Sequence, residues 1–375
     1  MNDACLRARA AKNFWRAVVK VVNFCLEASV SRQSLRLVQF QFPQKGRRVG
    51  LVDGKSVADL TSAYPKIVTV HDLFFRASSE AVSLTSFLES LPLGKLEPLA
   101  YHSLLNAQPG GRDPWLLPPL DHLDPAHCLI SGTGLTHLGS AAQRDQMHLA
   151  DPAMTTDSQK MFAMGQRGGK PGTGRGVQPE WFYKGNGLML KGHNDFLEVP
   201  EFAEDGGEEP EIAGCYVVDR TGIPCRLGFT VGNEWSDHAL EKGNYLWLAP
   251  SKLRTCSIGP ELVVTESFRD LRGRARIFRG ARLIYDSGAI ATGEENMCHS
   301  LANLEDHHFK NSQFRYPGDV HIHFFGTSRL SFGQCEPLSD GDRVEIEFEG
   351  MGPPLVNFVR RLPRSQEPVR VRCPA

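Results

Sequence analysis

Short runs of apolar residues, separated by Gly, Asp and Pro turns, recur along most of this chain. Residues 35–40, LRLVQF, predict a strand, and residues 47–52, RRVGLV, predict a second. Asp53-Gly54 is a hairpin-type turn, and residues 56–60 continue the pattern after it. Because the strands are short and closely spaced, we expect a small β-rich module at this end of the chain.

Further along, the pattern predicts a larger domain that consists mainly of strands. Residues 71–91 and 297–310 are the expected helices, and a Pro-rich connection over 109–119 places a boundary near Pro125. Residues 129–134 begin the second domain, and short β-type runs dominate from 199 to 357. Short strands without regular strand–helix alternation predict an α+β, mainly β, barrel-like domain and argue against a Rossmann sheet.

The first 34 residues differ from the rest. Basic residues dominate them, and apolar residues recur at every fourth position, as on one face of a helix. They could form a targeting or membrane-surface helix, or an extension ahead of the true domain, and we favour the extension. The predicted organisation is residues 1–34 as a basic extension, 35–125 as a small α+β domain, 126–361 as the catalytic domain and 362–375 as a tail.

Composition narrows the function classes. The chain has 375 residues and a formal net charge of -1, which argues against a general nucleic-acid binder. No run reaches the roughly 18 apolar residues of a membrane span, so we expect no membrane partner. Nine scattered cysteines without a Cys-x-x-Cys motif indicate a reduced, cytoplasmic compartment, with the cysteines as small apolar fillers.

Three acidic residues are the strongest chemical signal. Glu209 and Glu211 are two residues apart, and Tyr216-Val217-Val218 soon follows with β-type residues. On a strand that spacing places both carboxylates on one face, where they repel unless a cation, a proton or solvent separates them. Glu234 opens another polar stretch. Three oxygen ligands suit Mg²⁺, Mn²⁺ or Ca²⁺.

Residues 165–172, GQRGGKPG, are similar to a phosphate-binding loop but lack its required pattern. Met164 stands where a glycine is needed, and Pro171 follows Lys170 where Ser or Thr is needed. We interpret the run as a mobile polar loop whose Arg167 and Lys170 could contact an anionic substrate. The longer stretch 151–178 is expected to be a helix plus loop, or a lid over a site.

Other polar residues have both a functional and a plain interpretation. Lys252 is either a buried cation beside the carboxylates or a surface lysine. His137 is a candidate base only if it lies in a site, and is otherwise a satisfied histidine. His321 and His323 could bind zinc, but the polarity of a strand face explains them better because no further ligands follow at a finger-like spacing.

Six motifs then occur in a fixed order. They are Glu209-Pro210-Glu211, Asn233-Glu234-Trp235-Ser236, Lys252 with Gly259-Pro260, Pro317-Gly318-Asp319, Gly326-Thr327 and Gly341-Asp342-Arg343-Val344-Glu345-Ile346-Glu347. This series, over residues 129–357, resembles the fumarylacetoacetate hydrolase superfamily, and residues 179–184 look like that family's strand ending in lysine. Most members have aspartate at the position of Glu234 and Ala-Arg at Asp237-His238. These departures, with residues 178–184, are similar to the branch that dehydrates 2-keto-3-deoxypentonates.

The resemblance implies a fold, a cofactor and a reaction. The fold is a mixed β-roll that holds one Mg²⁺ (or Mn²⁺) through Glu209, Glu211 and Glu234. The metal would chelate the carboxylate and 2-keto oxygens of a small sugar acid, acidifying its C3 protons so that the C4 hydroxyl leaves. The product of this step in pentose catabolism is 2,5-dioxopentanoate (α-ketoglutarate semialdehyde). The family also implies a homodimer.

The same resemblance assigns roles to further residues. Lys184 and Lys252 would stabilise the enolate or relay protons, and His137 would act as an acid or base. The substrate-binding residues would be Thr327, which would hold the carboxylate, with Asn233 and Ser236.

Two alternatives remain open. A C–C hydrolase acting on a 2,4-diketo acid of the acylpyruvate type would need a water activated by a His–carboxylate pair. No Glu follows shortly after His137, which favours dehydration. A non-catalytic sugar-acid-binding protein of the same fold is the other alternative, and the intact metal carboxylates argue against it.

Overall fold

The structure is a computed structural model that describes residues 34–96, 98–139, 142, 156–363 and 367–374. The predicted extension therefore lies outside the described residues, apart from Ser34. Contacts within the chain group residues 35–375 as one compact unit, separate from residues 1–34. The division of residues 35–361 into two domains near Pro125 stays a prediction.

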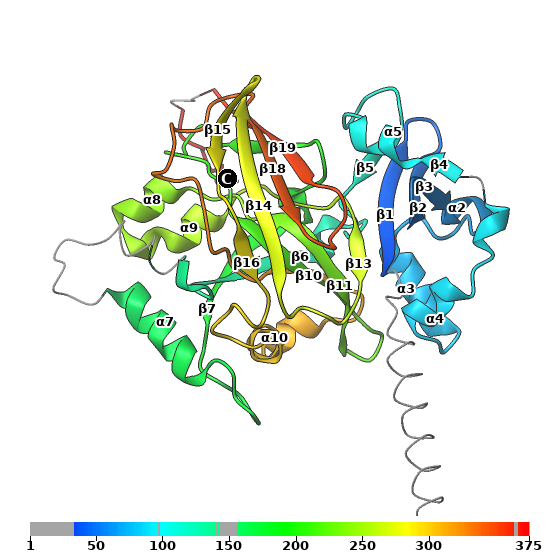
Figure 1. Ribbon diagram of the computed structural model, residues 1–375, viewed down its shortest axis with the longest axis horizontal. Coiled ribbons are helices and arrows are strands. Elements are labelled where there is room, and N and C mark those ends of the chain that lie inside the picture. The colour runs from blue at the N-terminus through cyan, green and yellow to red at the C-terminus, as the bar shows by residue number, and fades with distance from the viewer. Residues whose placement is uncertain (1–33, 97, 140–141, 143–155, 364–366, 375) are drawn as a thin grey trace, which may run out of the picture. The chain divides into compact units, whose positions relative to one another are not determined.

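The N-terminal part of this unit is a small sheet with short helices, drawn in blue and cyan in Figure 1. Its elements are β1 (Leu35–Phe42), β2 (Gly46–Asp53), β3 (Ser56–Asp59), α2 (Leu60–Ala63), α3 (Val70–Ser79), α4 (Leu84–Glu89), the 3₁₀ turn Leu93–Lys95, β4 (Pro98–Ala100), α5 (Tyr101–Asn106) and β5 (Trp115–Leu117). The predicted strands over 35–40 and 47–52 are confirmed, and that over 56–60 is confirmed up to Asp59, since Leu60 begins α2.

The single helix expected over residues 71–91 is wrong, because two helices occupy that range. Ala81 has a left-handed φ of 55°, which interrupts the helical path after α3. Ser83 then accepts a hydrogen bond from the N–H of Ser86 and caps a new helix, α4. The residues between the two helices thus end α3 and begin α4.

One large sheet runs from this module into the rest of the chain. It has 13 strands in the described residues, with the main order β4-β3-β2-β1-β13-β11-β10-β17-β6-β7. Its further strands are β6 (Cys128–Gly134), β7 (Glu180–Asn186), β8 (Leu190–Lys191), β10 (Pro210–Val218), β11 (Pro224–Asn233), β12 (Cys256–Ile258), β13 (Leu262–Val264) and β17 (Val320–Phe324). Strands β1 and β13 join antiparallel, so the N-terminal module continues the larger sheet.

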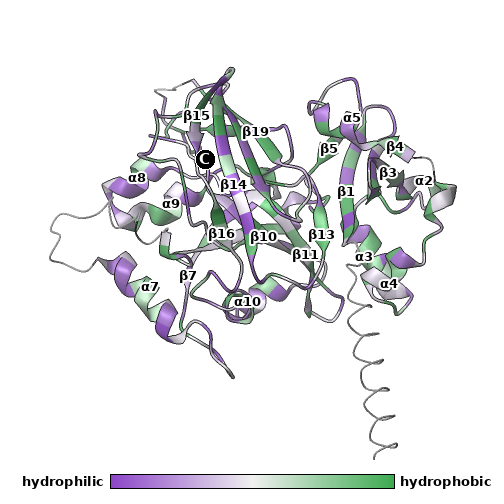
Figure 2. Cartoon of the chain, in the orientation of Figure 1, coloured by the Kyte–Doolittle hydropathy of each residue, from purple (hydrophilic) through white to green (hydrophobic). Residues whose placement is uncertain are grey.

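A second sheet of six strands packs in the same unit, with the order β15-β14-β18-β19-β9 and β16 beside β14. Its strands are β9 (Phe196–Val199), β14 (Leu271–Arg279), β15 (Arg282–Asp286), β16 (Ile290–Thr292), β18 (Arg343–Phe348) and β19 (Leu355–Arg361). In Figure 2, β14 alternates between hydrophilic and hydrophobic residues, as expected for a strand with one face on the core. The predicted α+β, mainly β, class is confirmed, with open mixed sheets in place of a closed barrel.

Strand β10 is the centre of the fold because every one of its residues is buried. Ala213, Cys215 and Val217 belong to one hydrophobic cluster, while Ile212 and Tyr216 belong to a second. A strand with both faces in apolar cores has no solvated side on which to place a charge. Burying carboxylates at its N-terminal end therefore costs free energy unless a cation, a proton or hydrogen-bond donors compensate for their charge.

The helices of this larger part are short. Those whose full span the structure describes are α7 (Asp157–Gly168), α8 (His238–Gly243), α9 (Leu248–Lys252) and α10 (Leu301–Phe309), with 3₁₀ turns at Pro125–His127, Gly187–Met189, Tyr245–Trp247 and Ser312–Arg315. The expected helix over 297–310 is present but begins four residues later, where Ser300 caps it. None of the described helices is long and apolar enough to cross a membrane.

Helix α7 corrects the prediction of a loop over residues 165–172, since the helix continues through Gly168. Thr156 and Gln159 form a capping box at its start, in which each side chain bonds the backbone of the other residue. The polar composition of this segment did not predict a helix. The capping box and one buried face stabilise it. The expectation of a helix plus loop within 151–178 is confirmed for the described residues from 156 onward.

All cysteines of the described residues are free thiols. Cys128, Cys215 and Cys256 are buried in the hydrophobic cluster around β10. For these three, the prediction that cysteine serves as a small apolar filler is confirmed.

A layer of buried histidines lies between β17 and α10. Trp181 Nε1 donates to His308 Nδ1 at 3.2 Å, so the proton of neutral His308 is on Nε2, which bonds His321 Nδ1 at 3.0 Å. His323 Nδ1 lies 2.8 Å from the Ser131 hydroxyl. The predicted strand-face position of the His-x-His pair is thus correct, although the face is buried under aromatic rings instead of solvated.

Burial in this layer makes stability depend on pH. Burial lowers the pKa of His321 to about 4 and that of His323 to about 3, from 6.5. Below pH 6.5 the unfolded chain binds these protons and the folded chain does not, so stability is lost as pH falls from 6.5 toward 4. At pH 4 each histidine lowers the free energy of unfolding by about 3 kcal/mol.

The slope of the free energy of unfolding against pH gives the number of protons taken up on unfolding. We therefore expect His323→Gln to lower that number by close to one between pH 6 and pH 4.5. The measurement is the free energy of unfolding in urea at several pH values, with the same replacement at the exposed His102 as the control. An unchanged slope in the His323 variant would show that this histidine is not held neutral by the fold.

Candidate metal centre

The start of β10 brings the three predicted metal ligands together. Glu211 has the same parity along the strand as Ala213, and Glu209 immediately precedes the strand. In the register of β10 with β11, Pro210 lies opposite Asn233, and the N–H of Glu234 donates to the carbonyl of Glu209 at 3.0 Å. One oxygen from each carboxylate lies within 4.8 Å of the other two, and all three side chains are buried.

Two lysines reach this cluster from other elements. Lys252, at the end of α9, donates to Glu209 Oε1 at 2.5 Å and to Glu234 Oε2 at 2.6 Å. Its ammonium also lies 4.8 Å from the centre of the Phe182 ring. Lys184, on β7, donates to Glu234 Oε1, to the carbonyl of Trp235 at 2.8 Å and to that of Lys252 at 2.9 Å.

Both lysines are fully enclosed, with exposed fractions of 0% for Lys184 and 1% for Lys252. The interpretation of Lys252 as a surface lysine is therefore excluded. All three N–H groups of the Lys184 ammonium have acceptors, so Lys184 holds Glu234 and the adjoining backbone in place. Lys252 instead lies between two of the three carboxylates.

The charges of the cluster do not cancel. Three carboxylates and two ammonium groups leave a formal charge of −1 in a buried space. Burial, followed by the charges of Glu234 and Glu209, raises the pKa of Glu211 well above its ordinary value. Burial also raises the pKa of Glu234, although Lys184 and Lys252 oppose the shift. A carboxylate in this position needs a proton or a further cation.

The Glu211 carboxylate is also incompletely bonded. Its Oε2 accepts the N–H of Gly326 at 2.7 Å, while its Oε1 is buried and has no hydrogen-bond partner among the described residues. An unpaired buried oxygen beside two other carboxylates matches the oxygen donors that Mg²⁺ and Mn²⁺ prefer. By this test Glu209, Glu211 and Glu234 fit a divalent metal.

Around the carboxylates lies a second ring of side chains, which includes a residue that the sequence analysis did not assign. His238 Nε2 lies 3.0 Å from Glu209 Oε1. Burial lowers the pKa of His238, but its hydrogen bond to Glu209 and the charge of that carboxylate outweigh burial, so the pKa ends above its usual value. Ser236 donates toward both oxygens of Glu234, at 3.2 and 3.1 Å.

The departure at Asp237-His238 has a structural counterpart. Arg254 donates to Asp237 at 3.0 Å, and Asp237 also accepts the N–H of Leu240 at 3.0 Å as the cap of α8. Arg254, just after the C-terminal end of α9, thus pairs with Asp237 of this motif. The signal in the sequence was the unusual Asp-His pair, but its partners are distant in the chain and could not be inferred from it.

The three predicted substrate-binding residues differ in their hydrogen-bond partners. Asn233 is fully buried, and neither atom of its carboxamide has a hydrogen-bond partner among the described residues. Thr327 directly follows Gly326, the donor to Glu211, and its hydroxyl bonds the carbonyl of Arg329 at 2.7 Å. Ser236 contacts Glu234 as described above. Their roles toward a substrate stay predictions.

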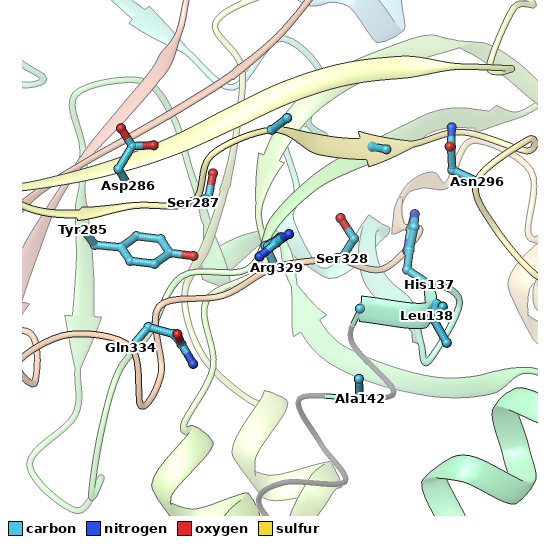
Figure 3. A pocket seen from close by; sticks show the side chains of 13 residues that line it. His137, Leu138, Ala142, Tyr285, Asp286, Ser287, Asn296, Ser328, Arg329 and Gln334 are labelled. Atoms are coloured by element: carbon cyan, nitrogen blue, oxygen red, sulfur yellow. The ribbon is translucent and has the colours of Figure 1, made fainter.

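His137 lies in a different setting from the glutamates. It lines a cavity of about 580 Å³ whose lining does not include the three carboxylates (Figure 3). Thr136 Oγ1 donates to the carbonyl of Phe325 at 2.7 Å, so it accepts from His137 Nδ1 at 2.9 Å, and His137 Nε2 then accepts from Thr292 at 3.0 Å. Burial lowers the pKa of His137 to about 4, so the ring is neutral at pH 7.

The fold and the site together define a class: a mainly β unit of mixed sheets with a buried cluster of three carboxylates whose oxygens suit a divalent cation. Comparison with known proteins agrees with this class. No family model matches the chain. A curated relative, described as a probable 2-keto-3-deoxyxylonate dehydratase of Haloferax volcanii, is 31% identical over 180 residues. The match covers 47% of this chain and spans 58% of that relative, which is less than two thirds of its length.

Solved structures share the fold over most of the chain. A 2-keto-3-deoxy-D-arabinonate dehydratase complexed with magnesium and 2,5-dioxopentanoate has a TM-score of 0.63 at 20% identity, covering 88% of this chain and 100% of that chain. A 5-carboxymethyl-2-hydroxymuconate delta-isomerase from Mycobacterium smegmatis has a TM-score of 0.52 at 17% identity, with the same coverage. These solved structures show that the chain shares their fold, and the named dehydratases among them agree with the resemblance predicted from the motifs.

The geometry gives a direct test of the metal ligands. We expect millimolar MgCl₂ to raise the melting temperature of the unaltered protein, because a ligand that binds only the folded state stabilises it. Glu211→Gln should remove that rise, since a neutral amide replaces the charged oxygen donor. Without added metal its melting temperature should equal or exceed that of the unaltered protein.

Glu208→Gln is the matched control. Glu208 is the buried neighbour of Glu209, but its carboxylate bonds Ser331 and not the cluster. Its response to MgCl₂ should persist. A Glu211→Gln variant that kept the full magnesium response would show that the cation binds elsewhere.

Proposed function

We propose that this protein is a metal-dependent hydro-lyase that dehydrates a 2-keto-3-deoxypentonate to 2,5-dioxopentanoate. The observation that carries the proposal is the buried cluster of Glu209, Glu211 and Glu234 with Lys252 inserted between two of the carboxylates. The relative of Haloferax volcanii and the fold shared with a 2-keto-3-deoxy-D-arabinonate dehydratase support it.

In the proposed reaction the three glutamates hold Mg²⁺ or Mn²⁺. When bound, the metal supplies Lewis-acid activation of a 2-keto acid, which makes the protons on C3 easier to remove. The protein then has to hold the substrate's carboxylate, stabilise negative charge on the keto oxygen and exclude water. Exclusion of water follows from the burial of all five charged groups in the cluster.

The two lysines divide these tasks. Lys252 Nζ lies among the ligand oxygens, where its positive charge stabilises the negative charge that develops on the substrate as C3 loses a proton. Lys184 already has three acceptors, so it acts by fixing the position of Glu234. This assignment refines the prediction that both lysines stabilise the enolate or relay protons.

Further residues complete the proposed site. The unpaired carboxamide of Asn233 supports a role in binding a polar group, and the position of Thr327 after Gly326 supports the proposed contact with the carboxylate. His137, neutral at pH 7, is suited to accept a proton and not to donate one. The homodimer stays a proposal based on the family resemblance. The cytoplasmic location stays a proposal based on the scattered cysteines.

One observation bears on the alternative of a C–C hydrolase for 2,4-diketo acids. Such an enzyme needs a His–carboxylate pair to activate water. The pair at the carboxylate cluster is His238 with Glu209, whereas the pair of His127 with Asp319 includes none of the three cluster carboxylates. Glu209 is also a proposed metal ligand, so His238 orients a ligand. Dehydration is therefore the better supported of the two reactions.

Purified protein with Mg²⁺ and 2-keto-3-deoxy-D-xylonate, or its L-arabinonate isomer, should yield the semialdehyde, followed with a coupled dehydrogenase. Chelation with EDTA should stop the reaction, and Mg²⁺ or Mn²⁺ should restore it. Absence of the semialdehyde, with pyruvate released from a 2,4-diketo acid instead, would establish the hydrolase.

The division between the lysines predicts different outcomes for two matched variants. Lys252→Met should lower kcat by roughly 100- to 1000-fold, the usual effect of losing one charge-stabilising donor, while magnesium still raises the melting temperature. Lys184→Met should lower the free energy of unfolding by about 3–5 kcal/mol, because it removes one partner of a buried ion pair and the donor to the carbonyls of Trp235 and Lys252. Equal effects of both variants on stability and on kcat would contradict this division.

A further inference from the structure

Apart from His137, the side chains that line the cavity beside it have no role in the reaction proposed so far. Strands β15 and β16 and several loops contribute to its walls, and its volume is about 580 Å³. Its polar lining consists chiefly of Tyr285, Asp286, Asn296, Ser328, Arg329 and Gln334. Figure 3 shows Tyr285 on one wall with its hydroxyl directed toward Arg329, which extends from the loop after β17.

That loop is attached to the metal-binding strand at two points. Near its start, the N–H of Gly326 donates to Glu211 Oε2 at 2.7 Å. Five residues later, Ser331 donates its N–H to Glu208 Oε1 at 2.7 Å and its hydroxyl to Glu208 Oε2 at 2.5 Å. Arg329 lies between these two points, so its backbone position is coupled to one carboxylate of the candidate metal centre, Glu211, and to Glu208, the neighbour of Glu209.

The polar groups facing the cavity include unused donors. Arg329 is exposed, and among the described residues neither its guanidinium nor the Tyr285 hydroxyl bonds a protein group. The charges of Glu208 and then of Arg329 act on the Tyr285 phenol. The acidic side chain of the lining, Asp286, is already paired with Arg274, whose Nε donates to it at 2.7 Å. The free charge in the cavity is therefore positive.

We propose that Arg329, with Tyr285, is the specificity-determining pair that binds the oxygen-bearing end of the substrate remote from its 2-keto acid group. The inference rests on the proposed function, because it takes the keto acid end to be held at Glu209, Glu211 and Glu234. Near its start the loop bonds a candidate ligand of that centre through Gly326, and Arg329 follows at the cavity three residues later. A terminal hydroxyl or carboxylate is the chemistry that a guanidinium and a phenol recognise.

Ser331 is a positioning residue in this arrangement. Its two hydrogen bonds to Glu208 fix the end of the loop that carries Arg329. Ser331→Ala removes the hydroxyl bond and keeps the backbone one, so the loop should loosen without loss of the fold.

A binding experiment can test the pair independently of turnover. The probes are 2-oxopentanoate and 2-oxoglutarate, which have the same number of carbons and differ in whether the far end is a methyl group or a carboxylate. Affinities for the Mg²⁺-loaded protein are measured by calorimetry. The unaltered protein should bind 2-oxoglutarate about tenfold more tightly, or better, as expected for one charge-assisted hydrogen bond.

Arg329→Met should remove this preference and leave the affinity for 2-oxopentanoate unchanged. Ser331→Ala should reduce the preference partly, and Arg112→Met, at an exposed arginine outside the cavity, should keep it. With the sugar-acid substrate, Arg329→Met should raise KM about tenfold or more with little change in kcat or in the magnesium response.

The outcomes separate the two proposals. A preference for 2-oxoglutarate that persists in Arg329→Met, or is absent from the unaltered protein, overturns the assignment of Arg329 and leaves the proposed reaction standing. Failure of the unaltered, Mg²⁺-loaded protein to bind either oxo acid overturns both, because no 2-keto acid is then held at the carboxylates.

Discussion

Five buried charges at the start of β10 are the constraint on which the rest of this structure depends. Glu209, Glu211 and Glu234 together carry one more charge than Lys184 and Lys252 can neutralise. Burying an uncompensated carboxylate is costly, and a fold retains it only where the surrounding structure enforces it. The apolar clusters on both faces of β10 provide that enforcement, because they leave the strand no solvated side.

The cluster also organises its surroundings. Glu234 is fixed by Lys184 and Ser236, Glu209 by Lys252 and His238, and Glu211 by the backbone of Gly326. Each carboxylate therefore keeps a defined orientation, which is what a metal ligand requires. Through Gly326 and the bonds of Ser331 to Glu208, the same strand sets the position of a loop whose arginine reaches the neighbouring cavity. The proposed metal binding and the proposed recognition of the far end of a substrate would thus be linked through β10 and the residues just before it.

Much of this could be predicted from the sequence, and the limits have physical causes. The strand spacing of Glu209 and Glu211 is a local pattern, and the order of the motifs brought Glu234, Lys184 and Lys252 into the same site. Helix boundaries were less predictable, since α7 depends on a capping box within a polar stretch and the break before α4 on one residue at positive φ. The contacts of His238 and the attachment of the loop at Ser331 depend on residues far apart in the chain, which periodicity does not reveal.

The most direct test is a crystal structure of the protein grown with Mn²⁺ and recorded near the manganese absorption edge. One anomalous peak bonded to Glu209, Glu211 and Glu234, with the Lys252 ammonium displaced from Glu209 but still beside the cluster, is the result predicted here. A peak bonded to other side chains, or an intact Lys252–Glu209 contact with no manganese among the three carboxylates, would contradict the claim that this buried charge exists to bind a cation.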